Sequence, residues 1–147
     1  GSFGVMGEKG PAGITTAELF DGKKVVLFAV PGAFTPTCSM AHLPGFVVHV
    51  DAIKAKGVDT VACMSVNDVF VMDAWGKASN AEHLLMLADG NGTFTAALGL
   101  ELDGTGYGMG TRSKRFAMIV ENGVVTLLNV DAGALEGSSA EAILAAL

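Results

Sequence analysis

Cysteine is scarce in this chain: 147 residues contain only Cys38 and Cys63. Two cysteines in a chain of this length exclude a disulfide-stapled scaffold and favour a reducing compartment. We therefore expect a cytoplasmic protein, with an organelle as the alternative if a transit peptide was removed. The first two residues, Gly1-Ser2, are expected to be a cloning remnant.

Basic charge and long apolar runs are also lacking. Nine Lys and Arg against fifteen Asp and Glu give a net charge of −6, which argues against nucleic acid or an anionic membrane as main partner. No apolar run approaches the length of a membrane span, and no secretory signal opens the chain. The length predicts a single domain over residues 1–147. With 50% hydrophobic and only 16% charged residues, apolar surface is left for a partner subunit.

One stretch organises the rest of the chain. The apolar run 24–30 is typical of a strand buried on both faces, and Pro31 and Gly32 end it. Thr35-Pro36 then predicts a helix start, with Thr35 as N-cap and Pro36 as the first helical residue. This register places Cys38 in the first helical turn.

A cysteine at a helix start lies among unpaired backbone N–H groups at the positive end of the helix dipole. Both favour the thiolate, which is the nucleophilic form of cysteine. The alternative is that Cys38 is a small buried hydrophobic residue, as many free cysteines are. A reactive sulfur is the interpretation that position favours.

The remaining pattern alternates strands and helices. An edge strand is expected at 3–6, a loop at 7–13, and an interruption of the Cys38 helix at Pro44-Gly45, because proline disfavours helical geometry in the residue before it. Asn122-Gly123 predicts a hairpin, and we expect the glycine-rich stretch 104–110 to be a flexible surface loop, since it lacks the spacing of a dinucleotide loop. Strands are otherwise expected at 60–65, 84–88, 116–120 and 124–130, and helices at 16–20, 46–56, 68–78, 93–98 and 141–147. Parallel strands followed by an antiparallel hairpin predict an α/β fold. With a cysteine at the first helix start, this fold resembles the thioredoxin architecture.

The motif Pro-x-x-x-Thr-x-x-Cys, here Pro31, Thr35 and Cys38, resembles the active-site signature of the peroxiredoxins. The fuller text PGAFTPTCS, then HLPGF, SVND and FVMDAW, is similar to the type II, or peroxiredoxin-five-like, subfamily, and the similarity covers nearly the whole chain. The resemblance implies a thioredoxin-like fold with a central mixed sheet flanked by helices and with peroxiredoxin insertions. It also implies a catalytic arginine just before a later strand. Arg115 matches it, and Arg112 is the second candidate.

The resemblance implies a thiol-dependent peroxidase for hydrogen peroxide and small alkyl hydroperoxides, which needs no cofactor or metal. Thiolate formation alone raises the reactive fraction only about 30-fold from the roughly 3% of a free cysteine at pH 7, so the rest must come from the transition state. Arg115 and Thr35 fit that need as hydrogen-bonding groups, and Pro31 would shield the sulfur from water.

Attack on peroxide would leave Cys38 as a sulfenic acid that has to be reduced. Cys63 is the one candidate for a resolving cysteine, but a buried core residue is the interpretation that we favour for it. No cysteine occurs in the late loop 131–139, where some family members have one. Without a resolving cysteine, glutathione and glutaredoxin or thioredoxin would regenerate Cys38. The subfamily also implies a homodimer.

Three other functions are alternatives to a peroxidase. A dithiol oxidoreductase would need Cys-x-x-Cys, but Thr35 stands at the first of those positions. A metal site of Cys38, His42 and His49 lacks a second pair with matching spacing, so these histidines, like His83, are expected to be structural or solvated. A redox sensor would use the same cysteine but react once and stop.

Overall fold

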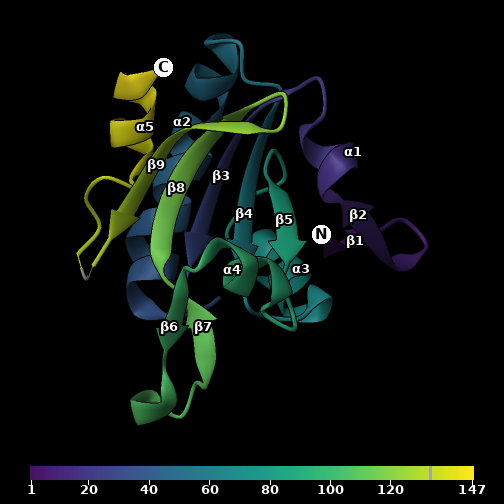
Figure 1. Cartoon of the computed structure of the whole chain (residues 1–147), viewed down its shortest axis with the longest axis vertical. Helices are drawn as coiled ribbons and strands as arrows, with labels where there is room; N and C mark the ends of the chain where they lie inside the picture. Colours follow the sequence, from purple (N-terminus) through teal and green to yellow (C-terminus); the bar gives the residue numbers. More distant parts are fainter. Residues whose placement is uncertain (133) are drawn as a thin grey trace.

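A seven-stranded mixed sheet forms the centre of the molecule, which is seen in a computed structural model that describes residues 1–132 and 134–147. The strand order is β2-β1-β5-β4-β3-β8-β9 (Figure 1). The strands are β1 (Ser2–Gly7), β2 (Gly10–Thr15), β3 (Lys24–Val30), β4 (Thr60–Ser65), β5 (Leu85–Ala88), β8 (Arg115–Glu121) and β9 (Val124–Asp131). The predicted α/β architecture with a mixed, helix-flanked sheet is confirmed.

Strand β3 lies in the middle of the sheet, as its unbroken apolar run predicts. It pairs in parallel with β4 and antiparallel with β8, and six of its seven residues are buried. Burial on both faces explains why the run shows no alternation of polar and apolar residues. The end of β3 therefore delivers Pro31 to a fixed point at the edge of a rigid core.

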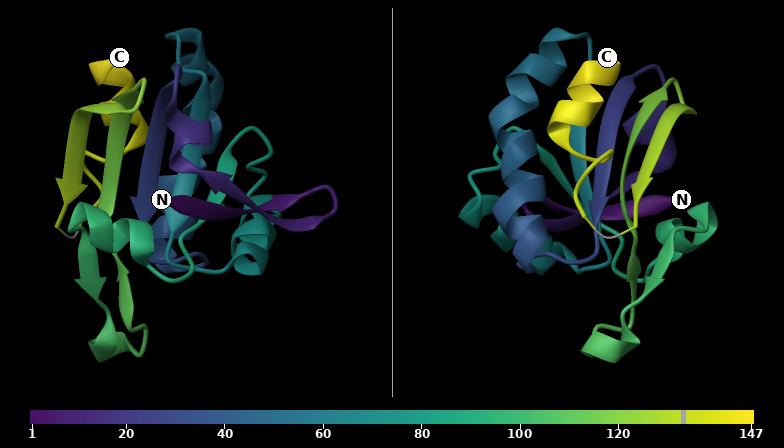
Figure 2. Two further views of the ribbon diagram at one scale, coloured as in Figure 1. Left: turned by 45° about the vertical axis from the view of Figure 1, so that its right-hand side comes forward. Right: turned by 90° about the vertical axis from the view of Figure 1, so that its left-hand side faces the viewer.

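Helices cover both faces of the sheet (Figure 2). On one face, β3 side chains such as Phe28 pack with Phe46, Trp75 and Ile143 from α2, α3 and α5. On the other face, Leu27 and its neighbours pack with Leu19 from α1, and Phe94 of α4 lies against this cluster. The helices are α1 (Thr16–Phe20), α2 (Leu43–Ala55), α3 (Val69–Ala78), α4 (Thr93–Leu98) and α5 (Ala140–Ala146).

The predicted break at Pro44-Gly45 is wrong. Helical backbone runs from Pro36 to Ala55, and the turn before the proline is a π-helix, η1 (Cys38–His42), that leads directly into α2. The N–H of Leu43 bonds to the carbonyl of Cys38, five residues back. This wider turn lets the chain pass the proline, which has no N–H to donate and crowds the preceding turn.

Two short hairpins were not predicted. Residues 10–15 form strand β2 beside β1 instead of a loop, although glycine and proline weaken its strand signal. The glycine-rich stretch is the tip of a two-stranded hairpin, β6 (Glu101–Asp103) and β7 (Thr111–Ser113), and includes a short 3-10 turn, η2 (Thr105–Tyr107). Figure 1 shows this hairpin projecting below the sheet. The other predicted strands and helices are confirmed to within one residue or two.

The predicted β8–β9 hairpin is confirmed with its turn at Asn122-Gly123. Asn122 has φ 48° and Gly123 has φ 79°, the positive angles that the tight turn requires. The turn, together with a register shift between Ile119 and Val120, places Arg115 opposite Asp131 at the far end of the ladder. Arg115 is thus the first residue of a buried strand that neighbours β3.

Candidate active site

The loop after β3 is held in one conformation by its neighbours. The amide of Ala33 donates to Oδ1 of Asn67 at 3.0 Å, and Ser65 donates to the same oxygen at 2.6 Å. Phe34 has φ 63°, a left-handed conformation that costs free energy in a residue other than glycine. The SVND segment at the end of β4 therefore fixes the loop that carries Pro31 and Thr35.

Thr35 begins the helix, but not through its side chain. Its carbonyl accepts the N–H of Ser39 at 2.9 Å, which is the first α-helical hydrogen bond. Its hydroxyl donates to the carbonyl of Gly32 at 2.6 Å. The sequence predicts that this side chain caps a backbone N–H, and that prediction is wrong. The lone pairs of the hydroxyl oxygen are left to accept a further hydrogen bond.

Cys38 lies in the first helical turn, as predicted, and Arg115 reaches it from β8. Nη2 of Arg115 donates to Sγ of Cys38 at 3.2 Å, across 77 residues of sequence. Both side chains are buried, with exposures of 1% for Cys38 and 7% for Arg115. A permanent positive charge in such a poorly hydrated place interacts strongly with any negative charge that forms beside it.

His42 holds the other side of the same guanidinium. Nη1 of Arg115 lies 2.8 Å from Nδ1 of His42, while Nε2 of His42 lies 2.9 Å from the carbonyl of Ser138. A carbonyl only accepts and a guanidinium only donates, so Nε2 carries the ring hydrogen and Nδ1 accepts. Burial lowers the pKa of His42 to about 4, the Ser138 carbonyl works against this shift, and the Arg115 charge adds to it. The imidazole is neutral at physiological pH.

Asp131 fixes the segment that contacts His42. Its carboxylate accepts from the amides of Glu136, Gly137 and Ser138 and from the Ser138 hydroxyl. Burial raises the pKa of Asp131, but these hydrogen bonds outweigh it and the net pKa is lowered. A continuous chain of contacts thus runs from Asp131 through Ser138, His42 and Arg115 to Cys38.

The second arginine candidate lies elsewhere. Arg112 donates from Nε to the carbonyl of Met109 and from Nη1 to the carbonyl of Val66, at 2.8 and 2.7 Å. It ties the β6–β7 hairpin to the loop after β4. Of the two arginines, only Arg115 contacts Cys38 in the described residues.

Cys63 is fully buried in β4, opposite Phe28 of β3, and both cysteines are free thiols. Burial raises the pKa of Cys63 well above its usual range, and the nearby Cys38 adds to the shift. The side chain is therefore a neutral thiol within the core. Movement of the backbone would be needed before it could act as a nucleophile.

The metal alternative loses its support. Both ring nitrogens of His42 are engaged, by Arg115 and Ser138, and His49 lies 3.4 Å from Glu141. Within residues 1–132 and 134–147, no group of three His, Cys, Asp or Glu side chains is arranged to hold a metal ion. His42 itself was expected to be structural or solvated, and its spacing of four residues from Cys38 was the one signal in the sequence that could have placed it at the site.

A pocket of about 380 Å³ lies beside this region. Pro31 and Arg115 form part of its wall, together with Leu102, Lys114, Val130, Asp131 and Ala132. It lies at the carboxyl end of β3, where the strand meets the start of β8. Cys38, Thr35 and His42 are not among the residues that line it.

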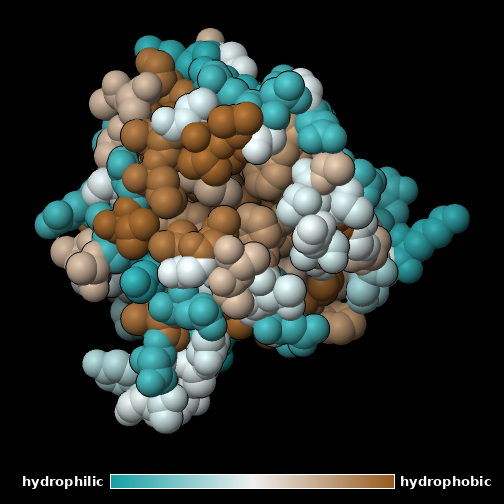
Figure 3. Space-filling model, in the orientation of Figure 1, coloured by the Kyte–Doolittle hydropathy of each residue, from teal (hydrophilic) through white to brown (hydrophobic). Residues whose placement is uncertain are grey.

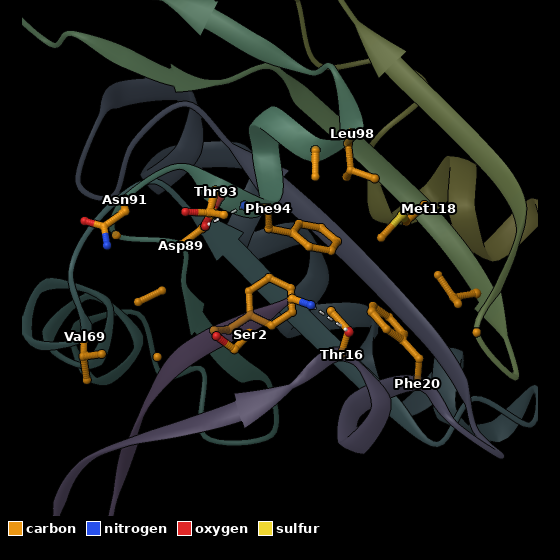
Figure 4. Close-up of a pocket in the computed structure, with 18 of the residues that line it drawn as sticks. Ser2, Thr16, Phe20, Val69, Asp89, Asn91, Thr93, Phe94, Leu98 and Met118 are labelled. Atoms are coloured by element: carbon orange, nitrogen blue, oxygen red, sulfur yellow. Dashed lines mark hydrogen bonds between the residues drawn. The ribbon is translucent and has the colours of Figure 1, made fainter.

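A second pocket is at a different place and has different chemistry. It has a volume of about 920 Å³ and lies on the α1 and α4 side of the sheet, between Phe20, Phe94, Leu98 and Met118 (Figure 4). Neither cysteine lines it, and its Asp89 carboxylate accepts hydrogen bonds from the backbone N–H groups of Phe94 and Thr95 in the first turn of α4. Hydrophobic side chains also gather on the face seen in Figure 3. Strand β9 leaves Val124, Val125, Leu128 and Val130 exposed.

A thioredoxin-like sheet that presents one cysteine at a helix start defines the class of redoxin proteins, and the family model described as Redoxin matches residues 5–144. Peroxiredoxin-2C of Arabidopsis thaliana is 55% identical over 136 residues, which cover 91% of this chain and 84% of the relative. A Vibrio vulnificus structure, reduced Prx3 in complex with H2O2, has 61% identity and a TM-score of 0.96 over 99% of this chain and 92% of that one.

Another relative, the chloroplastic Peroxiredoxin-2E of Arabidopsis thaliana, is 51% identical over 138 residues. The match covers 91% of this chain but only 59% of that protein. On these similarities the chain belongs to the peroxiredoxin family, the members of which are thiol peroxidases. The resemblance to type II peroxiredoxins and the predicted thioredoxin-like fold are confirmed. No helix in the described part of the chain has the length and apolar character to cross a membrane.

Proposed function

We propose that the chain reduces hydrogen peroxide and small alkyl hydroperoxides through a sulfenic acid on Cys38. The observation that carries this proposal is the contact of 3.2 Å between Nη2 of Arg115 and Sγ of Cys38 in a buried site. The similarity to the Vibrio vulnificus Prx3, whose reduced form was solved in complex with H2O2, supports the substrate class.

The reaction begins with the Cys38 thiolate. Its sulfur attacks the terminal O–H oxygen of the hydroperoxide, so that an S–O bond forms while the O–O bond breaks. The electron pair of the broken bond leaves with the second oxygen, which takes up a proton and departs as water or an alcohol. The proton lost when the thiol ionised balances the one taken up, and Cys38 is left as sulfenic acid, two electrons oxidised.

Negative charge develops on the departing oxygen, and Arg115 is the group that stabilises it. A buried guanidinium offers several fixed donors and a permanent charge, and one of them already lies beside the sulfur. Thr35 donates its hydroxyl hydrogen to Gly32, so its oxygen is available to accept the O–H of the substrate. Pro31 lines the neighbouring pocket, and the role assigned to it is to keep bulk water from the sulfur.

Reduction of the sulfenic acid is assigned to an external thiol. One thiol displaces water to form a mixed disulfide with Cys38, and a second thiol releases the Cys38 thiol and a disulfide. The complete burial and raised pKa of Cys63 support the interpretation that it is a core residue and not a resolving cysteine. Glutathione with glutaredoxin is the proposed reductant, and thioredoxin is the alternative.

A steady-state assay of hydrogen peroxide consumption tests this function. Reduced protein is supplied with glutathione and glutaredoxin in one arm and with thioredoxin and its reductase in another. Wild type and Cys63→Ser should turn over repeatedly, whereas Cys38→Ser should not. Consumption of a single equivalent of peroxide in both arms would instead indicate a sensor, and an active Cys38→Ser variant would refute the proposal.

A homodimer and a compartment complete the proposal. Phe34, Met40 and Phe70 have exposures of 56%, 81% and 64%, apolar surface that a second copy could cover. Sedimentation that gives the mass of one chain at micromolar concentration would contradict the dimer.

The cytoplasm is kept as the predicted compartment, and the chloroplastic name of one relative supports the organellar alternative.

A further inference from the structure

The Arg115 guanidinium is held at two points by one helix. Nη2 contacts Cys38 and Nη1 contacts His42, which lies four residues later in the same helix. A guanidinium on a long side chain can rotate and swing, so a single contact with sulfur would not fix where its donors point. The second contact removes that freedom.

His42 is itself fixed, and in only one tautomer. The Ser138 carbonyl accepts from Nε2–H, which leaves Nδ1 as an acceptor aimed at Arg115. The rings of Phe28 and Phe46 pack near the imidazole, with centroids 4.9 and 5.7 Å away, and its exposure is 1%. Asp131 holds Ser138 from the other side through the backbone amide and hydroxyl of that residue.

We infer that His42 is a positioning residue that aims Arg115 at the reacting oxygen, and that Ser138, held by Asp131, keeps it in the required tautomer. This inference rests on the proposed function. It gives the C-terminal segment around Ser138 a part in the chemistry, although that segment is far from the Cys38 motif in the sequence. His42 acts only through Arg115 and does not itself touch the substrate.

Two matched substitutions test the contacts of the two ring nitrogens separately. His42→Asn places an amide oxygen where Nδ1 accepts from Arg115, but it cannot reach Ser138. His42→Gln places an amide nitrogen near the position of Nε2, so the contact with Ser138 is kept while the acceptor for Arg115 is lost. The single-turnover rate with hydrogen peroxide should fall by about 10- to 100-fold in His42→Gln, a range typical of misplaced catalytic groups, and much less in His42→Asn.

The combination with Arg115→Gln shows whether His42 works through the arginine. If it does, adding His42→Gln to Arg115→Gln should cause no further loss, because the group to be aimed is already gone. Alkylation of Cys38 by iodoacetamide, which forms no oxyanion that Arg115 must stabilise, is the control for damage to the helix. It should change little in both His42 variants.

The outcomes that overturn the inference are distinct from failure of the proposed function. A His42→Gln variant with the wild-type peroxide rate, or one whose loss is repeated in full in the Arg115→Gln background, would make His42 structural only. Equal slowing of alkylation and peroxide reduction would lead to the same conclusion. A wild-type protein that leaves peroxide unreacted would refute the proposed function itself.

Discussion

Replacement of Arg115 by glutamine should slow oxidation of Cys38 by roughly a hundredfold. The guanidinium is 7% exposed and donates to Sγ at 3.2 Å, so it lies within hydrogen-bonding reach of an oxygen that leaves the sulfur. Loss of one donor to such an oxygen typically costs about 3 kcal/mol, which corresponds to about two factors of ten in rate. Glutamine removes the charge and is shorter than arginine, but it leaves a polar amide in the buried site.

The assay is a single turnover in stopped flow with hydrogen peroxide in excess. The single tryptophan reports on the site, because Nε1 of Trp75 donates at 3.0 Å to the hydroxyl of Ser39, the residue after Cys38. Free thiol is titrated in quenched samples as a second readout. Arg112→Gln is the matched control and should retain a rate close to wild type, because its bonds go to the carbonyls of Met109 and Val66.

Two results would refute the reasoning. One is an Arg115→Gln variant with the wild-type peroxide rate. The other is an equal loss of iodoacetamide reactivity, which would mean that the substitution had closed access to the sulfur and had not removed a transition-state contact. Equal slowing in Arg112→Gln would likewise remove the distinction between the two arginines on which the assignment depends.

Three further predictions concern stability. Burial and the Arg115 charge lower the pKa of His42 to about 4 in the folded chain, although the Asp131 carboxylate opposes this shift. Between pH 6.5 and about 4 only the unfolded chain protonates His42, so the free energy of unfolding should fall by roughly 3 kcal/mol as the pH falls through this window. Urea denaturation of wild type and His42→Gln at several pH values tests this, and the same dependence of unfolding free energy on pH in both proteins would contradict it. Gly123→Ala should lower the free energy of unfolding by about 1 kcal/mol because φ is 79°, whereas Gly106→Ala, with nothing within 4 Å of a new Cβ, should be nearly neutral in the same denaturation. Cys63→Ser should lower the melting temperature, since a hydroxyl in this fully buried site costs about 1–3 kcal/mol without a partner; a variant as stable as wild type would show that the site is not dry.

The sequence predicts the elements whose local signals agree with their packing. The run 24–30 is apolar without alternation because β3 is buried on both faces, and Asn122-Gly123 forms the turn that its positive φ angles allow. Short exposed strands give no such signal. The β6 strand is exposed at all three positions and β2 is mostly exposed, so neither shows an apolar pattern.

Parts of the site depend on contacts that no local pattern encodes. His42 is separated from Arg115 by 73 positions in the sequence and from Ser138 by 96, yet the three residues form one hydrogen-bonded network. Helical spacing brings His42 near Cys38, but it does not tell whether the ring meets a guanidinium, a metal or solvent. The break predicted at Pro44 does not occur for a similar reason. The helix passes the proline through a π-helical turn, and no local sequence pattern predicts such a turn.

Peroxide oxygen should end on the Cys38 sulfur, and mass spectrometry of reduced protein after one equivalent of hydrogen peroxide tests this directly. With a sulfenic-acid trap such as dimedone present, the adduct is predicted on the peptide that contains Cys38, in high yield in wild type and far more slowly in Arg115→Gln. Oxygen found on methionine or on Cys63, with Cys38 unmodified, would contradict it.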